Sequence, residues 1–146
     1  MNNKDISISI LGNIYSFHNL IKRVNKDRYK VDKSLTEKQF FALSELKKYD
    51  KMELKKLSNQ LHVSTSSLCI LLNKLVEKGY VYREEDKRDR RNTFYGLTNE
   101  GSEVFNDQVI KFIEVINEKI DTLSIEDKQK LLICMCDLRE IIDKLK

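Results

Sequence analysis

The chain has 146 residues, which suits one domain or one domain with an added oligomerisation element. No proline, only 4 glycines and 34% charged residues favour a largely helical protein, and no apolar run approaches the roughly 18 residues of a membrane-spanning helix. The polar start Met1–Asp5 is unlike a signal peptide, and an odd number of cysteines argues against a disulfide framework, so we expect a cytoplasmic protein.

The charge of +4 is unevenly distributed along the chain. Residues 1–98 hold 20 lysines and arginines against 12 acidic residues, whereas residues 99–146 hold 7 against 11. This asymmetry predicts a polyanionic partner for the first part only. Cys134 and Cys136 would point to different helix faces, and neither His18 nor His62 has a ligand cluster beside it, so we expect no metal and no cofactor.

The first two elements are predicted to be helices. Apolar residues three and four apart indicate a helix over about residues 5–26, namely Ile6, Ile10, Ile14, Phe17, Ile21 and Val24. A basic connector is expected over residues 26–33. Thr36 and Gln39 then form a capping box, which predicts the start of a second helix that ends within Lys47–Asp50.

The next segments predict a helix-turn-helix. A short helix over Glu53–Leu61 is followed by the turn His62–Val63. Ser64 is the expected cap of a second helix over Thr65–Lys78, and Gly79 suits a left-handed position at its end. Two helices joined by so short a turn are typical of this motif.

A β-hairpin is predicted directly afterwards. Two β-type runs, Gly79–Tyr82 and Thr93–Leu97, flank the segment Tyr82–Asn92, in which five side chains are basic and four are acidic. Helix, turn, helix and hairpin in this order form a winged helix. An arginine-rich tip suits a narrow, negatively charged groove, because arginine is planar and always ionised. The alternative is a solvated surface turn whose charges cancel.

Two longer helices complete the chain. One is expected from Thr98 to about Thr122, and the other is capped by Ser124 and reaches Leu145. With the first helix, they carry more apolar surface than a small winged helix could cover. Stripes of this length predict a partner helix from a second chain, although packing within one chain is the alternative.

Several motifs, in this order along the chain, resemble the MarR family of winged helix-turn-helix regulators. They are Leu35-Thr-x-x-Gln39-Phe, Leu57-Ser-x-x-Leu61-x-Val63-Ser64, Leu75-x-x-x-Gly79, Asp86-x-Arg88-Asp89-x-Arg91 and Leu97-Thr98-x-x-Gly101. The resemblance implies a mainly α (α+β) fold. It also implies a left-handed residue at His62, where the family usually has glycine; histidine tolerates that conformation better than β-branched residues do. Residues 35–98 would form a winged helix-turn-helix DNA-binding lobe, and residues 1–34 and 99–146 a helical dimerisation region.

The resemblance also implies a function. The chain would be a homodimer that binds double-stranded DNA at a pseudo-palindromic operator, with half-sites about one helical turn apart. Most members of the family repress transcription, and many release DNA on binding a small aromatic acid or on cysteine oxidation. The usual effector pocket would be bordered here by Tyr15, Phe17, His18 and Tyr29; the alternative is that these four are ordinary core and dimer residues.

The DNA-contacting residues are expected on two elements. In the recognition helix they are Ser64, Thr65, Ser66, Ser67, Ile70, Asn73 and Lys74. In the wing they are Arg88, Arg90 and Arg91, with Asp89 holding Arg91 in position through a charge-assisted pair. Ile70 replaces a residue that is often basic, so it would touch thymine methyl groups or else be partly buried against the preceding helix. Cys69 is expected to be a half-buried thiol, with a redox role as the alternative.

Two other classes of protein differ in how well they fit the sequence. A winged helix that has lost DNA binding and acts as a protein-interaction module is the alternative to a regulator, because the recognition helix holds only two basic residues from Thr65 to Lys78. An enzyme is not expected. The sequence has no glycine-rich phosphate loop, no Ser/His/Asp order and no paired carboxylates in an apolar setting.

Overall fold

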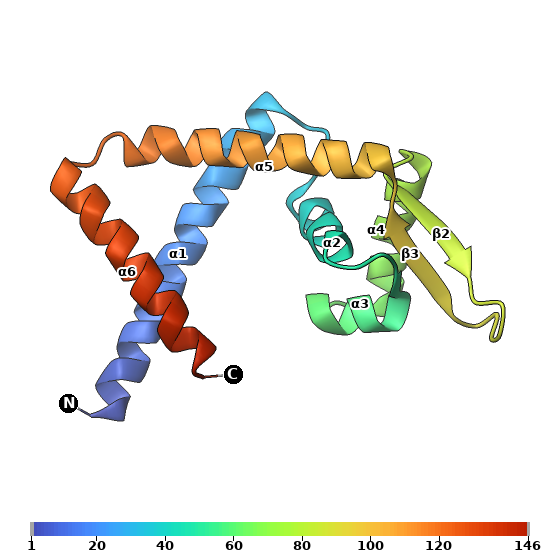
Figure 1. The fold of residues 1–146 in the computed structure, drawn as a ribbon, viewed down its shortest axis with the longest axis horizontal. Helices are drawn as coiled ribbons and strands as arrows, with labels where there is room; N and C mark the ends of the chain where they lie inside the picture. The colour runs from blue at the N-terminus through green and yellow to red at the C-terminus, as the bar shows by residue number, and fades with distance from the viewer. Residues whose placement is uncertain (1, 146) are drawn as a thin grey trace. The chain divides into compact units, whose positions relative to one another are not determined.

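The structure, a computed structural model, describes residues 2–145, except for the side chain of Val31. It is mainly helical, as expected, and contains one small sheet. The elements are α1 (Asn3–Val31), α2 (Glu37–Lys47), β1 (Met52–Glu53), α3 (Leu54–Leu61), α4 (Thr65–Glu77), β2 (Val81–Glu85), β3 (Thr93–Leu97), α5 (Asn99–Ile120) and α6 (Ile125–Asp143) (Figure 1).

The chain forms two compact units, Met1–Phe112 and Ile113–Lys146. The first unit contains α1, the helix-turn-helix, the sheet and the beginning of α5, and the second contains the rest of α5 and α6. Within residues 2–145, no helix combines the length and the apolar character that crossing a membrane requires.

The first helix is longer than predicted. The basic stretch 26–33, expected to be a connector, is helical as far as Val31. This stretch contains neither proline nor glycine, and Arg28 and Lys30 lie in the last turn, where positive charge favours the helix dipole. The helix ends at Asp32, whose backbone amide donates to the carbonyl of Arg28 and whose carboxylate accepts from the amide of Ser34 at 2.7 Å.

The predicted caps are confirmed. The amide of Gln39 donates to Thr36 Oγ1 at 3.2 Å, and the amide of Thr36 donates to Gln39 Oε1 at 3.0 Å, which completes the capping box at the start of α2. Ser64 accepts from the amide of Ser67 and caps α4. His62, in the turn between α3 and α4, has φ 53° and ψ 41°, so it occupies the expected left-handed conformation.

The sheet has three strands in the order β1-β3-β2, and both neighbouring pairs are antiparallel. The short strand β1 was not predicted, because two residues carry no readable alternation. Strand β2 extends to Glu85, beyond the predicted end at Tyr82, so the charged tip is the shorter segment 86–92. The tip is closed by a hydrogen bond of 3.0 Å from the amide of Asp86 to the carbonyl of Asn92.

The core of the winged lobe lies between α2, α3, α4 and the sheet. Its buried apolar residues are Leu35, Ala42, Leu43, Leu46, Met52, Leu57, Leu68, Leu72, Leu75, Val81, Tyr95 and Phe105. The helical members recur three and four residues apart, which places them on the inner faces of their helices. This core holds α4 and the β2–β3 hairpin in one lobe.

The start of α5 packs tightly on the end of α4. Thr98 Oγ1 donates to the carbonyl of Gly79 at 2.6 Å and accepts from the amide of Gly101 at 3.0 Å. A Cβ atom on Gly101 would lie 1.9 Å from the carbonyl oxygen of Tyr80. The Thr98-x-x-Gly101 pattern is therefore the local requirement for joining α5 to the hairpin.

A buried polar network joins the end of α1 to α5 within the first unit. Arg28, only 1% exposed, donates to Gln108 Oε1, and Gln108 Nε2 donates to Asp32 Oδ2 at 2.7 Å. Lys111 also pairs with Asp32. Hydrogen bonding from Lys111, with smaller contributions from Ser34, holds the pKa of Asp32 well below its usual range despite the opposing effect of burial. Burial lowers the pKa of Arg28.

Large apolar side chains remain exposed on α1 and on α6. On α1 they include Ile8, Leu11, Ile14, Tyr15 and Phe17, and on α6 they include Leu132, Ile133, Leu138, Ile141 and Ile142. These faces contain many of the stripe residues that the sequence pattern assigns to a partner helix.

Candidate nucleic-acid interface

The first turn of α4 presents a polar surface. Ser64, Thr65, Ser66 and Ser67 are all exposed. The Ser64 hydroxyl caps the helix and lies within hydrogen-bonding distance of the Ser66 and Ser67 hydroxyls, at 3.2 and 2.9 Å. A helix start with exposed hydroxyl groups suits the phosphates or base edges of a nucleic acid.

The exposed face of α4 continues through Ile70, Asn73 and Lys74. These residues are three and four positions apart, so they lie on one side of the helix. Ile70 is 62% exposed, and the alternative of partial burial against α3 is therefore wrong. An exposed isoleucine on this face offers an apolar contact where many recognition helices carry a charge.

Cys69 lies at the edge of this face of α4, one helical turn before Asn73. It is half-buried and next to the buried Tyr95 of β3, whose pKa is raised first by burial and then by Cys69. The amide group of Asn73 approaches its sulfur at 3.9 Å. The thiol thus faces the sheet, and the expectation of a half-buried cysteine is met.

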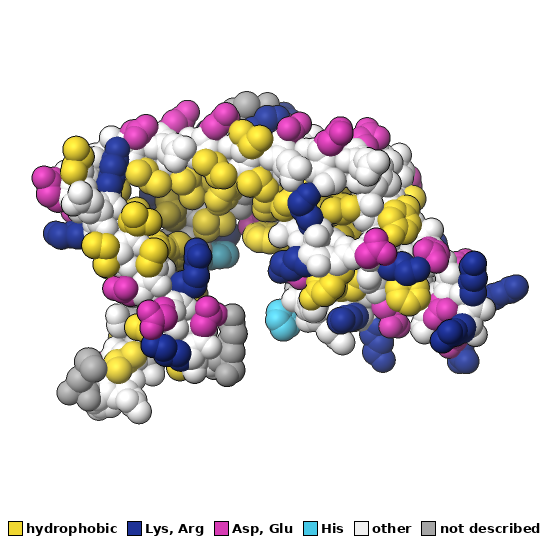
Figure 2. Space-filling model, in the orientation of Figure 1, with side chains coloured by type: hydrophobic (Ala, Val, Ile, Leu, Met, Phe, Trp, Pro, Cys, Tyr) yellow, Lys and Arg dark blue, Asp and Glu magenta, His cyan; other side chains and the backbone are white. Residues whose placement is uncertain are grey.

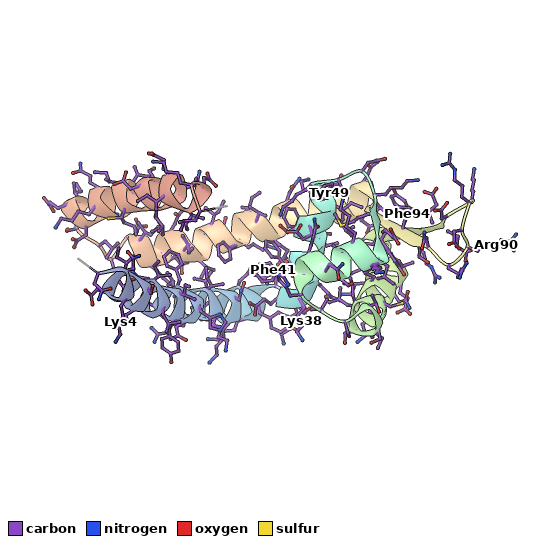
Figure 3. The ribbon with its side chains drawn as sticks, turned by 90° about the horizontal axis from the view of Figure 1, so that it is seen from below. Lys4, Lys38, Phe41, Tyr49, Arg90 and Phe94 are labelled. Atoms are coloured by element: carbon purple, nitrogen blue, oxygen red, sulfur yellow. The ribbon has the colours of Figure 1, made fainter. Side chains whose placement is uncertain are left out.

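The tip of the β2–β3 hairpin carries Arg88, Arg90 and Arg91, all exposed. Lysine and arginine side chains gather around this end of the winged lobe in Figure 2, and Arg90 projects from the end of the hairpin in Figure 3. Asp89 Oδ1 accepts from the backbone amide of Arg91 at 3.0 Å and from its Nε at 3.3 Å. Asp89 therefore orients both the backbone and the side chain of Arg91.

The base of the hairpin is anchored to the lobe. Lys51, just before β1, donates to the carboxylate of Glu84 in β2 at 3.0 and 3.1 Å and lies 5.4 Å from the ring centre of Phe94. The ring of Tyr82 covers Gly96 so closely that a Cβ atom there would lie 2.4 Å from it. These contacts fix the direction in which the hairpin leaves the sheet.

The four aromatic and histidine residues expected to border an effector pocket all lie on α1. Tyr15 and His18 line a shallow apolar hollow of about 690 Å³ on that helix. Tyr29 lines another, of about 320 Å³, together with Lys22, Lys26, Arg28 and Glu37. Phe17 lines neither, so the structure does not bring the four residues together in one pocket.

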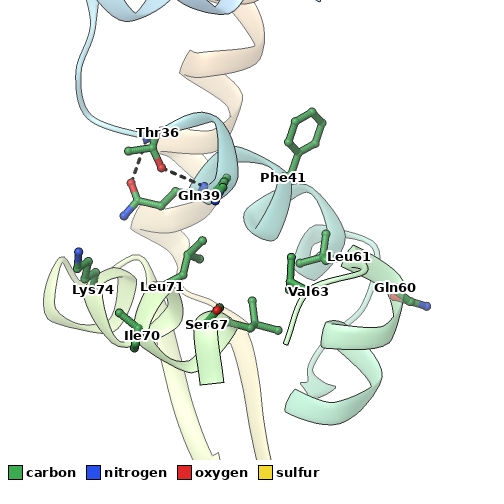
Figure 4. Close-up of a pocket in the computed structure, with 12 residues that line it drawn as sticks. Thr36, Gln39, Phe41, Gln60, Leu61, Val63, Ser67, Ile70, Leu71 and Lys74 are labelled. Atoms are coloured by element: carbon green, nitrogen blue, oxygen red, sulfur yellow. Dashed lines mark hydrogen bonds between the residues drawn. The ribbon is translucent and has the colours of Figure 1, made fainter. Parts of the chain in front are cut away.

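A third hollow lies between α2, α3 and α4, and we call it the α2–α4 hollow (Figure 4). Its volume is about 630 Å³, and it is lined by Thr36, Lys38, Gln39, Phe41, Gln60, Leu61, Val63, Ser67, Leu68, Ile70, Leu71 and Lys74. Three of the predicted recognition residues, Ser67, Ile70 and Lys74, therefore share a surface with Lys38 and Phe41 of α2. Lys38 and Phe41 were not among the predicted site residues, because no local sequence pattern relates α2 to α4.

Among residues 2–145, no group of three or more histidine, cysteine or acidic side chains is arranged to hold a metal ion. The fold and its charged hairpin define a winged helix-turn-helix protein.

The comparisons with known proteins agree with this class. The model of the MarR family matches residues 35–93. Over 95 residues, the chain is 30% identical to the HTH-type transcriptional regulator SarZ of Staphylococcus haemolyticus, a match that covers 61% of this chain and 65% of that protein. The chain thus spans less than two thirds of the length of this curated relative. The match to the MarR family lies in the winged-helix segment of the chain.

Solved structures extend the likeness in fold to nearly the whole chain. The apo form of MarR from E. coli superposes with a TM-score of 0.76 at 20% identity and covers 86% of this chain and 92% of that one. The transcriptional regulator BldR from Sulfolobus solfataricus has a TM-score of 0.71 at 23% identity and covers 99% of both chains. At these identities the superpositions establish the fold alone.

Proposed function

We propose that this protein is a regulator of transcription that binds double-stranded DNA in a sequence-specific manner as a homodimer. One observation carries the proposal: the winged lobe combines an exposed polar face on α4 with an arginine-rich hairpin tip. A recognition helix of this kind fits a major groove, and an arginine-tipped wing fits the narrower minor groove beside it.

Each residue of the face has a role in the proposal. Thr65 and Ser66 contact phosphates at the start of α4, and Lys74 contacts a phosphate farther along. Asn73 pairs with adenine, and Ile70 packs on thymine methyl groups, which favours operators rich in A·T pairs. Arg88, Arg90 and Arg91 contact the minor groove and its phosphates, while Asp89 holds Arg91 in place.

The dimer is proposed from the exposed apolar faces. Residues 1–34 and 99–146 would form the dimerisation region, and residues 35–98 the DNA-binding lobe. Burial of side chains such as Leu11, 69% exposed, and Leu132, 66% exposed, would stabilise the dimer by removing apolar surface from water. Two copies related by a two-fold axis require a pseudo-palindromic operator.

The proposal includes repression, which follows when a bound dimer occupies a promoter, and a cytoplasmic location, where the DNA would lie. It also includes release by a small aromatic acid. Tyr29 supports this last part, since it lines a hollow with three basic residues, Lys22, Lys26 and Arg28, and one acidic residue, Glu37. The net positive charge of these four would attract a carboxylate. The protein would have neither catalytic activity nor a cofactor.

A second candidate is a protein-interaction module that has lost DNA binding. It is favoured by the apolar side chains that the lobe exposes near α4, where Phe41 is 46%, Val63 41% and Ile70 62% exposed. Exposed apolar patches commonly mark protein contacts. The arginine-rich wing favours DNA instead.

A salt titration of duplex binding separates the two candidates. Duplexes selected by the protein from a random pool would be titrated by fluorescence anisotropy between 50 and about 200 mM salt. A DNA-binding dimer should lose affinity steeply as salt rises, because each neutralised phosphate releases counterions. Failure to bind any duplex at low salt would reject the regulator and favour the interaction module.

A further inference from the structure

We propose that the α2–α4 hollow seats a phosphate of the DNA backbone between the ammonium groups of Lys38 and Lys74. Helix α2 would then be a third point of contact with the duplex, beside α4 and the wing. The inference rests on the proposed function and adds to it a residue, Lys38, that neither the sequence motifs nor the helix-turn-helix geometry assigns.

The charges of the hollow favour an anion. Lys38 comes from the first turn of α2 and Lys74 from the exposed face of α4, and both line the hollow. Among the described residues, neither side chain takes part in a salt bridge or hydrogen bond within the lobe, and no acidic side chain lines the hollow. Two ammonium groups without a compensating acid create a positive potential at this place.

The nearest acidic residue in sequence does not cancel that potential. Glu37 precedes Lys38, but it lines the other hollow, where Lys22, Lys26 and Arg28 surround it. Its charge also contributes to raising the pKa of Arg28 against the effect of burial. The negative charge of Glu37 therefore acts on a different face of α2.

The lysines, rather than the end of α2, are the ligands. The capping box occupies the amides of Thr36 and Gln39 within the helix start, as the dashed lines in Figure 4 show. The helix start thus offers few free donors to a phosphate. The apolar side chains of Phe41, Val63 and Ile70 line the same hollow and lower the local dielectric constant, which strengthens an ammonium–phosphate attraction.

Continuity with α4 identifies the anion as DNA backbone. Ser67, Ile70 and Lys74 line the hollow and also belong to the α4 face proposed to enter the major groove. A helix about 10–12 Å across fills a groove of about 12 Å, so an element packed beside the helix meets the phosphates of the groove wall. Helix α2 is packed beside α4 in this way, and the wing lies on another side.

The test compares Lys38→Ala with a matched control, Lys4→Ala. Lys4 is an exposed lysine near the start of α1, well away from Lys38 in Figure 3. Affinity for a selected duplex and for an unrelated duplex would be measured at several salt concentrations. We expect Lys38→Ala to weaken both about equally and to reduce the slope of log affinity against log salt by about 1 for each lysine lost from a phosphate contact.

Lys38→Arg should keep the slope, because it keeps the charge, and Lys4→Ala should leave it unchanged. The inference is wrong if Lys38→Ala, with an unaltered thermal unfolding curve, leaves the slope at the wild-type value; the hollow would then serve another anionic partner, such as an acidic peptide. It is also wrong if Lys4→Ala causes the same loss, or if the loss is confined to the selected duplex. A wild-type protein that binds no duplex would overturn the proposed function as well.

Discussion

At the scale of single residues, neighbouring charged side chains of the wing make different contacts. Asp89 is used within the hairpin tip, where it accepts two hydrogen bonds from Arg91, whereas Arg90 projects from the end. Holding one arginine by a carboxylate fixes its direction and leaves the next one available for a groove. The acidic side chains of the tip would therefore not make it electrostatically inert.

The Arg90→Ala variant tests this assignment. It should weaken binding to a selected duplex by about 1–3 kcal/mol, because it removes a charge from a groove contact. Arg23→Ala, which removes an exposed arginine of α1, is the matched control and should have little effect. Anisotropy titrations at moderate salt would measure both, and an unchanged affinity for Arg90→Ala would refute the wing contact.

At Gly101, an added side chain would collide with the backbone of a neighbouring residue. In Gly101→Ala, the added Cβ would meet the carbonyl oxygen of Tyr80 at 1.9 Å, so α5 must move away from the end of α4. Overpacking of this kind costs about 1–3 kcal/mol, and a backbone neighbour cannot rotate aside. Urea unfolding should show this loss of stability.

The control for that variant is Gly12→Ala in α1. A Cβ atom at Gly12 meets nothing within 4 Å, and alanine favours a helix over glycine by about 0.5–1 kcal/mol. We expect this variant to be at least as stable as the wild type. Equal stability of Gly101→Ala and the wild type would show that α5 does not need the close approach to Tyr80.

At the scale of elements, the junction between α1 and α5 depends on buried polar groups. Arg28 lies 5.6 Å from the ring centre of Phe40, which stacks on Phe105 of α5 with a distance of 5.1 Å between ring centres. Asp32 and Gln108 complete the junction through the hydrogen bonds described above. Removing one member leaves another buried group unsatisfied, so the junction is expected to respond as a unit.

The junction should make stability depend on pH through Asp32. Its pKa is lowered in the folded state, chiefly by the hydrogen bond from Lys111, so its contribution is present above the unfolded pKa of about 3.9 and is lost as the pH falls below that value. Asp32→Asn should therefore cost about 1–3 kcal/mol near pH 7. The difference between variant and wild type should shrink as the pH falls.

Urea unfolding of both proteins from neutral to strongly acidic pH would measure this difference. Asp107→Asn, at an exposed position of α5, is the control and should unfold like the wild type. If the gap between Asp32→Asn and the wild type stays constant at every pH, the carboxylate is not stabilised by the junction.

At the scale of the whole molecule, the exposed apolar faces of α1 and α6 carry the proposed dimer interface. Full burial of one leucine is worth about 1.5–3 kcal/mol, and a two-fold interface buries each residue twice. Leu11→Asp and Leu132→Asp should therefore convert a dimer into a monomer, because a charge at such a place would have to lose its water.

Light scattering after size-exclusion chromatography would report the mass of each variant. Phe41→Asp places the same charge at an exposed apolar residue of the winged lobe, 46% exposed, and should remain dimeric. A monomeric wild type, or a dimer that survives both leucine substitutions, would contradict the proposed dimerisation region.

Much of the fold could be predicted from local patterns. Residue type and spacing predict the capping box at Thr36 and Gln39 and the cap at Ser64, and the family resemblance predicts the left-handed His62. The structure confirms all three. The predicted end of α1 was several residues too early, because a run of basic side chains resembles a loop. Such side chains are in fact favourable at the C-terminal end of a helix. Strand β1 was missed because it exists only through pairing with β3.

Only part of the candidate interface could be predicted, because local patterns relate only residues that are close in sequence. Ile70, Asn73 and Lys74 share a helix, so their spacing reveals a common face, and the arginines of the tip are neighbours in sequence. Lys38 and Phe41 belong to another helix, and nothing in their spacing relates them to α4. The roles of all these residues in binding stay predictions until the variants are measured.

Hydrogen bonds within a turn and the periodicity of a helix act over three or four residues, so composition and spacing were sufficient to define the helices, their caps and the winged-helix order. Packing between distant segments decided the rest, because it depends on shape and volume that no short pattern records. The α2–α4 hollow, the contact of Gly101 with Tyr80 and the junction of Arg28, Asp32 and Gln108 are all of this second kind.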